Sequence, residues 1–132
     1  MLVLSLCALA LAGPPAAVTP LADAPVRTHP AGVARVQVLS RGDNAFVARL
    51  VLAPGVTLPE HRDATEEVVH VLRGTGTVTI DGRSWEVGPG HTLFMPAGAL
   101  VSYVNGPEES EVVQVFAGPE PAAKYDAWTV AP

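Results

Sequence analysis

The sequence predicts an all-β protein in which many short strands form a sandwich or a barrel. Between residues 33 and 118 of the 132-residue chain, apolar residues occur in short runs of the kind that form strands. Proline and glycine fall between these runs and not inside them, as they do at turns. This region has no sustained helical period, and regularly spaced short strands are typical of sandwiches and barrels.

The strands are placed by alternation and by apolar runs. Residues 35–39 alternate between apolar and polar side chains, whereas residues 46–52 include apolar residues on both parities. A run of the second kind indicates a strand that is covered on both faces. Further strands are predicted, in chain order, over residues 67–72, 77–80, 83–87, 92–95, 102–104 and 111–116.

One turn can be specified in detail. Asp81 and Gly82 separate the alternating run 77–80 from the run 83–87. An Asp-Gly pair favours a type I′ turn, because this turn needs positive φ at both central residues. We therefore expect a hairpin in which Val78 and Trp85 face each other.

The N-terminal segment differs from the rest of the chain. Residues 1–12 carry an apolar run that is too short to span a membrane and that ends in small residues, as signal peptides do. We expect an exported protein, periplasmic or extracellular, with no transmembrane span after cleavage. Cys7 is the only cysteine, so the cleaved protein would have no thiol.

Two further segments flank the predicted strands. Residues 13–32 are rich in Pro and Ala and are predicted to form a linker or an extended arm. Residues 119–132 form a C-terminal tail, which either folds back on the domain or packs loosely.

Charge and composition limit the partners. The formal net charge is −5, and the eight Lys and Arg residues form no basic stripe, so nucleic acid is not expected as a partner. Charged residues make up 16% of the chain, below the usual share of about 25%. So few charges in a small domain indicate an apolar interface, and we expect a homodimer.

Two stretches of the sequence resemble the two motifs of the cupin superfamily. The matching positions are Gly55, His61, Glu67 and Gly74 in the first motif, and Gly90, Pro96, Gly98 and Asn105 in the second. The resemblance spans about residues 55–105. It implies a single-domain, type-2 conserved cupin barrel over residues 33–118, with the fold of a double-stranded β-helix or jelly roll.

Two positions depart from these motifs: Asp63 stands where the family has its second His, and Val101 where it has its third. Residues i and i+2 of a strand share a face, so His61 and Asp63 are expected to point the same way, which in the family is into the barrel. The resemblance implies that Glu67 joins them from the next strand and that Val101 faces them.

The resemblance also implies a metal, because the family's usual site is three His and one Glu around a divalent transition metal. Here His61, Asp63 and Glu67 form an oxygen-rich set, which favours a harder ion such as Mn²⁺ or Mg²⁺. We expect no certain cofactor, and at most a weakly bound divalent metal (Mn, Mg, Fe, Ni or Zn).

Without a metal, the same three groups share a small cavity. Two nearby carboxylates raise each other's pKa, and His61 between them would tend to keep its proton. Such a cluster can act as a general acid/base pair or can simply hydrogen-bond a polar ligand. Tyr103 shares the parity of Val101 and is predicted to line the same pocket, where it can stack on a ligand.

Three other polar residues are expected to be structural. His70 has the opposite parity to Glu67 and should face away from the interior. His91 follows Gly90 and should lie in a loop at the barrel end. Arg49 could supply a pocket cation, but a place on the surface or at an interface is favoured.

Three functions stay open at this point. The favoured one is an exported small cupin that binds a small organic ligand and has a degraded or weak metal site. The second is a metal-dependent enzyme, an oxygenase, lyase or isomerase, that uses His61, Asp63 and Glu67. The third is a metal-free isomerase or cyclase that uses the His–carboxylate cluster. Fold analogy does not separate them, because this fold carries many functions.

Overall fold

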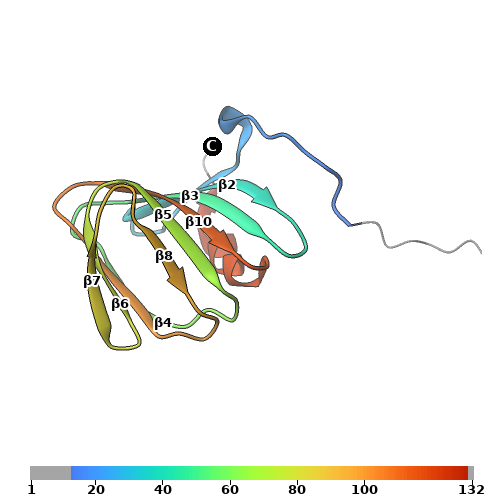
Figure 1. Ribbon diagram of the computed structural model, residues 1–132. Helices are drawn as coiled ribbons and strands as arrows, with labels where there is room; N and C mark the ends of the chain where they lie inside the picture. The colour runs from blue at the N-terminus through green and yellow to red at the C-terminus, as the bar shows by residue number, and fades with distance from the viewer. Residues whose placement is uncertain (1–12, 131–132) are drawn as a thin grey trace, which may run out of the picture.

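A computed structural model describes residues 13–130, which form two facing antiparallel sheets in a jelly-roll β-barrel (Figure 1). The seven-stranded sheet contains, in spatial order, β11 (Thr129–Val130), β1 (Val26–Thr28), β2 (Ala34–Arg41), β3 (Phe46–Leu52), β10 (Ser110–Phe116), β5 (Glu67–Arg73) and β8 (Thr92–Met95). The four-stranded sheet contains β4 (Thr57–His61), β9 (Val101–Asn105), β6 (Gly76–Ile80) and β7 (Arg83–Val87). Two 3-10 helices, η1 (Leu21–Asp23) and η2 (Glu120–Ala127), lie near the ends of the chain. The predicted all-β fold is confirmed.

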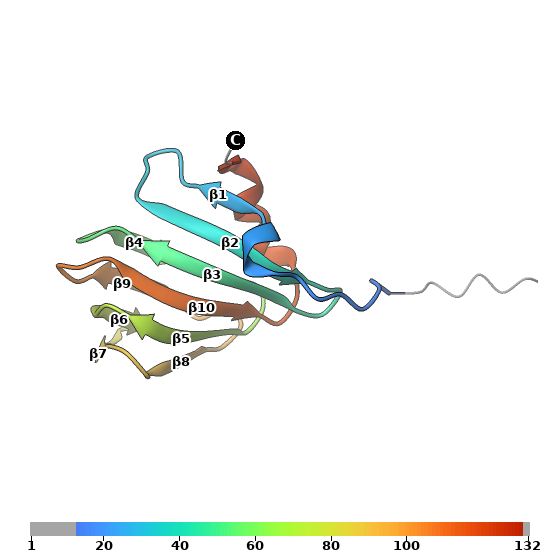
Figure 2. The same ribbon diagram turned by 90° about the horizontal axis from the view of Figure 1, so that it is seen from above.

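The predicted strands all form, and three further strands appear. The additional strands are β1, β4 and β11. Strand β1 lies inside the segment predicted to be a linker or arm and pairs with both β2 and β11. Residues 13–20 are exposed, and Figure 2 shows this blue stretch leading away from the barrel. The predicted signal peptide, residues 1–12, lies outside the described residues.

The hairpin forms as predicted. Asp81 and Gly82 have φ values of 48° and 83°, which a type I′ turn requires at its two central positions. Val78 and Trp85 are direct cross-strand partners. Val78 is buried, whereas Trp85 is 38% exposed because β7 is the edge strand of its sheet.

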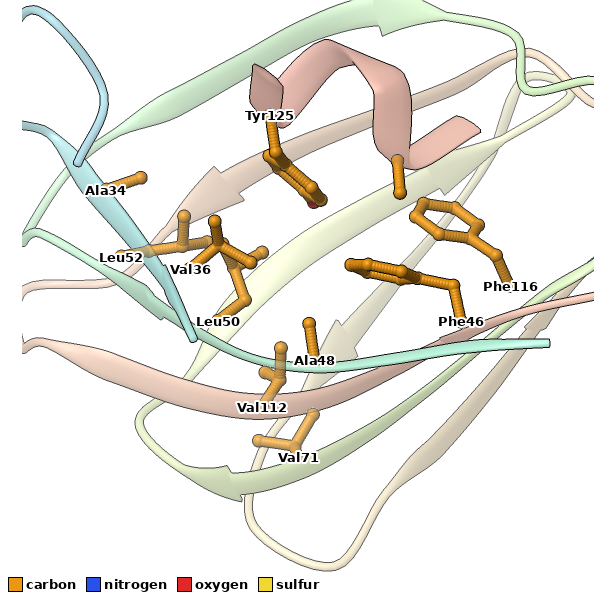
Figure 3. Packing of buried hydrophobic residues seen from close by; sticks show 11 residues of the cluster. Ala34, Val36, Phe46, Ala48, Leu50, Leu52, Val71, Val112, Phe116 and Tyr125 are labelled. Atoms are coloured by element: carbon orange, nitrogen blue, oxygen red, sulfur yellow. The ribbon is translucent and has the colours of Figure 1, made fainter. Parts of the chain in front are cut away.

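The main core lies on the inner face of the larger sheet. It is built from alternate residues of β2, β3 and β10 together with residues of η2, and Figure 3 shows its members Ala34, Val36, Phe46, Ala48, Leu50, Leu52, Val71, Val112, Phe116 and Tyr125. Phe46 and Phe116 are fully buried. A second, smaller cluster of Val78, Val87, Met95, Ala99 and Val101 lies against the smaller sheet.

The C-terminal tail folds back on the barrel. Tyr125 is 4% exposed, and its ring lies 6.1 Å from the ring of Phe46 (Figure 3). Trp128 continues this contact with an edge-on approach to Tyr125, and β11 then pairs with β1. Of the two alternatives for the tail, the packed one is therefore found. None of the helices within residues 13–130 has the length and apolar character needed to cross a membrane.

Asn105, the last motif residue, joins three parts of the barrel. Its side-chain amide donates hydrogen bonds to the carbonyl oxygens of Leu52, Ala53 and Glu108, at 3.3, 2.8 and 3.1 Å. Its amide oxygen accepts hydrogen bonds from the hydroxyls of Tyr103 and Ser110. The motif Asn is therefore structural: it ties β9 to the end of β3 and to the start of β10.

Candidate functional site

A cavity of about 570 Å³, open to solvent on one side, lies between the two sheets. Most of its wall is apolar and comes from alternate residues of β5, β8 and β9, with η2 and Trp128 also contributing. All five residues predicted for the pocket line it: His61, Asp63, Glu67, Val101 and Tyr103.

His61 is the last residue of β4, and Val101 is its direct partner on β9. The Nδ1 atom of His61 lies 2.8 Å from the carbonyl oxygen of Pro59. A carbonyl only accepts hydrogen bonds, so Nδ1 carries a proton. In the neutral ring Nε2 is therefore the atom with the free lone pair, and it lies 3.7 Å from Oδ2 of Asp63.

Asp63 reaches the cavity by a route that differs from the prediction. Strand β4 ends at His61, so Asp63 lies in the following loop and the i, i+2 parity of a strand does not place it. A backbone hydrogen bond of 2.8 Å, from the amide of Gly98 to the carbonyl of Asp63, holds this loop against the second motif. The expected shared direction is found, because both side chains line the cavity.

Glu67 opens β5 and is only 7% exposed. The side-chain amide of Gln114 donates a hydrogen bond of 2.7 Å to Oε1 of Glu67, and the hydroxyl of Tyr125 donates one of 2.6 Å to the amide oxygen of Gln114. Burial raises the pKa of Glu67, with a smaller upward effect from Asp63, while Gln114 and Lys124 act against it. The site thus holds a buried carboxyl group whose proton affinity exceeds that of an exposed Glu.

Tyr103 lines the cavity, and its hydroxyl is engaged by Asn105 at 3.2 Å. Burial raises the pKa of Tyr103. Its ring lies against Gly76, where a Cβ would also come within 2.7 Å of the carbonyl oxygen of Val104. The hydroxyl is thus held by the barrel, and the ring is the part that is placed to contact a ligand.

The other three polar residues lie elsewhere. His70 is exposed, and its Nδ1 is 2.8 Å from Oγ1 of Thr92 on the outer face. His91 lies in the turn after β7, where its Nδ1 accepts a hydrogen bond from the amide of Gly88 at 3.0 Å. Arg49 forms an ion pair with Glu111 on the neighbouring strand β10 and does not line the cavity.

Sequence reasoning missed three residues of the site: Gln114, Lys124 and Tyr125. Gln114 shares the parity of Val112 and Phe116 in β10, and a polar residue on a buried parity was a usable signal. Lys124 is the only lysine of the chain, but nothing in the tail sequence shows that it returns to the first motif. Its ammonium nitrogen lies 3.1 Å from Oδ1 and 3.3 Å from Oδ2 of Asp63.

The donor set, as arranged, does not fit a divalent transition metal. Within residues 13–130, no three His, Cys, Asp or Glu side chains are grouped so that they could hold a metal ion. Val101 has no lone pair, Glu67 accepts a hydrogen bond from Gln114, and the carboxylate of Asp63 is engaged by an ammonium group. The His61, Asp63 and Glu67 side chains therefore line one cavity without forming a metal centre.

The sequence matches the family of the cupin domain over residues 48–116. It is 35% identical over 91 residues to dimethylsulfoniopropionate lyase DddW of Ruegeria pomeroyi, covering 65% of this chain and 60% of the lyase. It is also 38% identical over 63 residues to endoribonuclease YbeY of Myxococcus xanthus, covering 48% of this chain and 21% of that protein. The chain thus spans less than two thirds of the length of either relative.

Solved structures of other proteins share the fold of this chain. An RmlC-like cupin from Shewanella frigidimarina superposes with a TM-score of 0.70 at 17% identity, covering 76% of this chain and 89% of that one. The polyketide cyclase RemF from Streptomyces resistomycificus superposes with a TM-score of 0.65 at 22% identity, covering 76% and 78%. At these identities the likeness concerns the fold alone.

Proposed function

Because the chain belongs to the cupin family, we propose that it binds a small organic molecule inside the barrel. The cavity of about 570 Å³ carries this proposal, since ligand sites are concave, mainly apolar and hold a few convergent polar groups. The ligand has a largely apolar body that contacts the wall near Val101 and Tyr103. Its polar group lies beside His61, Asp63 and Glu67.

Binding of a fluorescent apolar probe, anilinonaphthalene sulfonate, tests this proposal. Val101 is buried and points into the cavity, so Val101→Phe fills part of it and should weaken probe binding about tenfold. Val104→Phe is the matched control, because Val104 lies on the same strand but is 49% exposed on the outer face. Absence of probe binding by the wild type, or equal binding by both variants, would overturn the proposal.

A second candidate is acid–base catalysis on the bound molecule, favoured by the buried carboxyl of Glu67 beside the His61 ring in one cavity. A buried carboxyl with a raised pKa can hold a proton and pass it to a bound molecule, and its hydrogen bond from Gln114 fixes its orientation. The lyase among the relatives makes dimethylsulfoniopropionate the first compound to try.

Consumption of dimethylsulfoniopropionate by the purified protein, followed by proton NMR, tests this second candidate. Glu67→Gln should abolish turnover while leaving probe binding in place. Turnover that is equal in the wild type and in Glu67→Gln would rule out this use of the carboxyl.

We also propose that the protein is exported, on the basis of the predicted signal peptide. N-terminal sequencing of the protein isolated from its native host should find a chain that starts after Ala12 or within the next several residues. An intact Met1 on a cytosolic protein would contradict export.

A further inference from the structure

The first motif and the C-terminal tail meet at an ion pair at the edge of the cavity, where the Lys124 side chain is 38% exposed. The Asp63 side chain is only 16% exposed and contacts the Lys124 ammonium through both carboxylate oxygens, at 3.1 and 3.3 Å. The same ammonium nitrogen lies 5.1 Å from the centre of the Phe116 ring and 5.9 Å from that of Tyr125. Lys124 therefore has a carboxylate and two aromatic faces as neighbours, all of which favour a cation.

The position of Lys124 follows from the packing of η2. Ala122 and Tyr125, on either side of Lys124 in the sequence, are both buried in the main core. Tyr125 is further fixed by its hydrogen bond to Gln114, which in turn holds Glu67. The helix η2, which carries Lys124, is thus fixed through Gln114 to Glu67, one of the two carboxyl groups near the ammonium.

A cation is needed at this place. Asp63 and Glu67 are two carboxyl groups that line one mainly apolar cavity, and the charge of Asp63 disfavours the ionised form of Glu67. Cupins often bind a metal such as Mn, which would supply positive charge at such a place. At position 63, where the family motif has His, this chain has Asp, which supplies an anion that can pair with a lysine.

We propose that Lys124 is the built-in cation of this barrel: its ammonium group replaces a divalent metal as the counter-charge to Asp63 and Glu67. A metal bound to Asp63 would need a carboxylate oxygen at about 2.0–2.2 Å, so it would have to displace the ammonium from the same oxygens. Lys124 therefore excludes divalent cations from the site. This proposal does not depend on whether the cavity binds an organic ligand.

Calorimetric titration with Mn²⁺ and with Ni²⁺ tests the exclusion. Lys124→Met removes the charge and keeps most of the length of the side chain, so it should bind these ions at least about tenfold more tightly than the wild type. Lys124→Arg keeps the charge and should behave like the wild type. Adding Asp63→Asn to Lys124→Met should remove the gain, because the freed carboxylate is then lost.

Paramagnetic broadening supplies a second readout on the wild type. Lys124 is the only lysine, so reductive methylation with ¹³C-formaldehyde gives one side-chain NMR signal, which keeps its positive charge. Dilute Mn²⁺ should leave this signal sharp. Broadening of the Lys124 signal, tight binding of metal by the wild type, or no gain in affinity in Lys124→Met would each overturn the proposal.

Discussion

Glu67 shows how one side chain can link the cavity to pH. Burial raises its pKa, so the folded protein holds this proton to a higher pH than the unfolded chain does. The contribution of Glu67 to stability is therefore fully present below pH 4.5, its ordinary value, and is lost as the pH rises through the folded pKa.

Glu67→Gln should remove this dependence. Urea denaturation at a series of pH values should show that the free energy of unfolding of the wild type declines, relative to that of the variant, as the pH rises above 4.5. Glu86→Gln, at an exposed residue of β7, is the control and should keep the slope of the wild type. Parallel curves for the wild type and Glu67→Gln would contradict the prediction.

Val101 gives the second prediction at this scale. It lies directly opposite His61 and faces the cavity, so Val101→His combined with Asp63→His would bring three imidazole groups to one place. Affinity for Ni²⁺ should rise by orders of magnitude over that of the wild type, because imidazole nitrogen suits this ion. Asp63→His with Val104→His, whose second imidazole points outward, should not reach this affinity when the same titration is made. If the two double variants bind Ni²⁺ equally, Val101 does not face the site in solution.

At the scale of elements, Asn105 decides how β3, β9 and β10 are joined. Asn105→Ala leaves three carbonyl acceptors, of which that of Leu52 is buried, and two hydroxyls without this partner, and we expect a loss of roughly 3 kcal/mol in the free energy of unfolding. Asn44→Ala, in the exposed loop after β2, should change stability little. Thermal and urea denaturation measure both, and equal midpoints would show that Asn105 is not a structural joint.

The strands and helices also show which parts of the fold can be predicted from the sequence and which cannot. The strands at 46–52, 83–87 and 92–95 were predicted to the residue. Their residues alternate or are apolar because one or both faces of each strand are covered within the sheet, and this pattern can be read in the sequence. Strand β1 was missed because three residues in a Pro-rich segment carry no pattern, and only pairing with β2 and β11 makes them a strand. Lys124 was missed for a related reason. It reaches Asp63 only because η2 packs against the barrel, and this packing is not visible in the local sequence.

For the whole molecule, we propose a homodimer. Val51, on the outer parity of β3, is already only 5% exposed within a single chain. Leu72 and Phe94, on the outer faces of β5 and β8, are 47% and 54% exposed and are better candidates for an interface. Light scattering at micromolar concentration should give the mass of a dimer, and Phe94→Ser should lower it. A monomeric wild type would contradict the proposal.

The pairing of β1 with β11 affects the order in which parts of the protein fold during synthesis. Arg27 and Val130, near the two ends of the described chain, are register partners, so this contact cannot form until residue 130 has been synthesised. Contacts between residues so distant in sequence also form slowly, because a large loop must close first. The Lys124 ammonium and the Tyr125 ring, which η2 brings to the cavity, therefore arrive late. A nascent chain that has not yet extended past η2 therefore has most of its strands but lacks the ammonium group that faces Asp63.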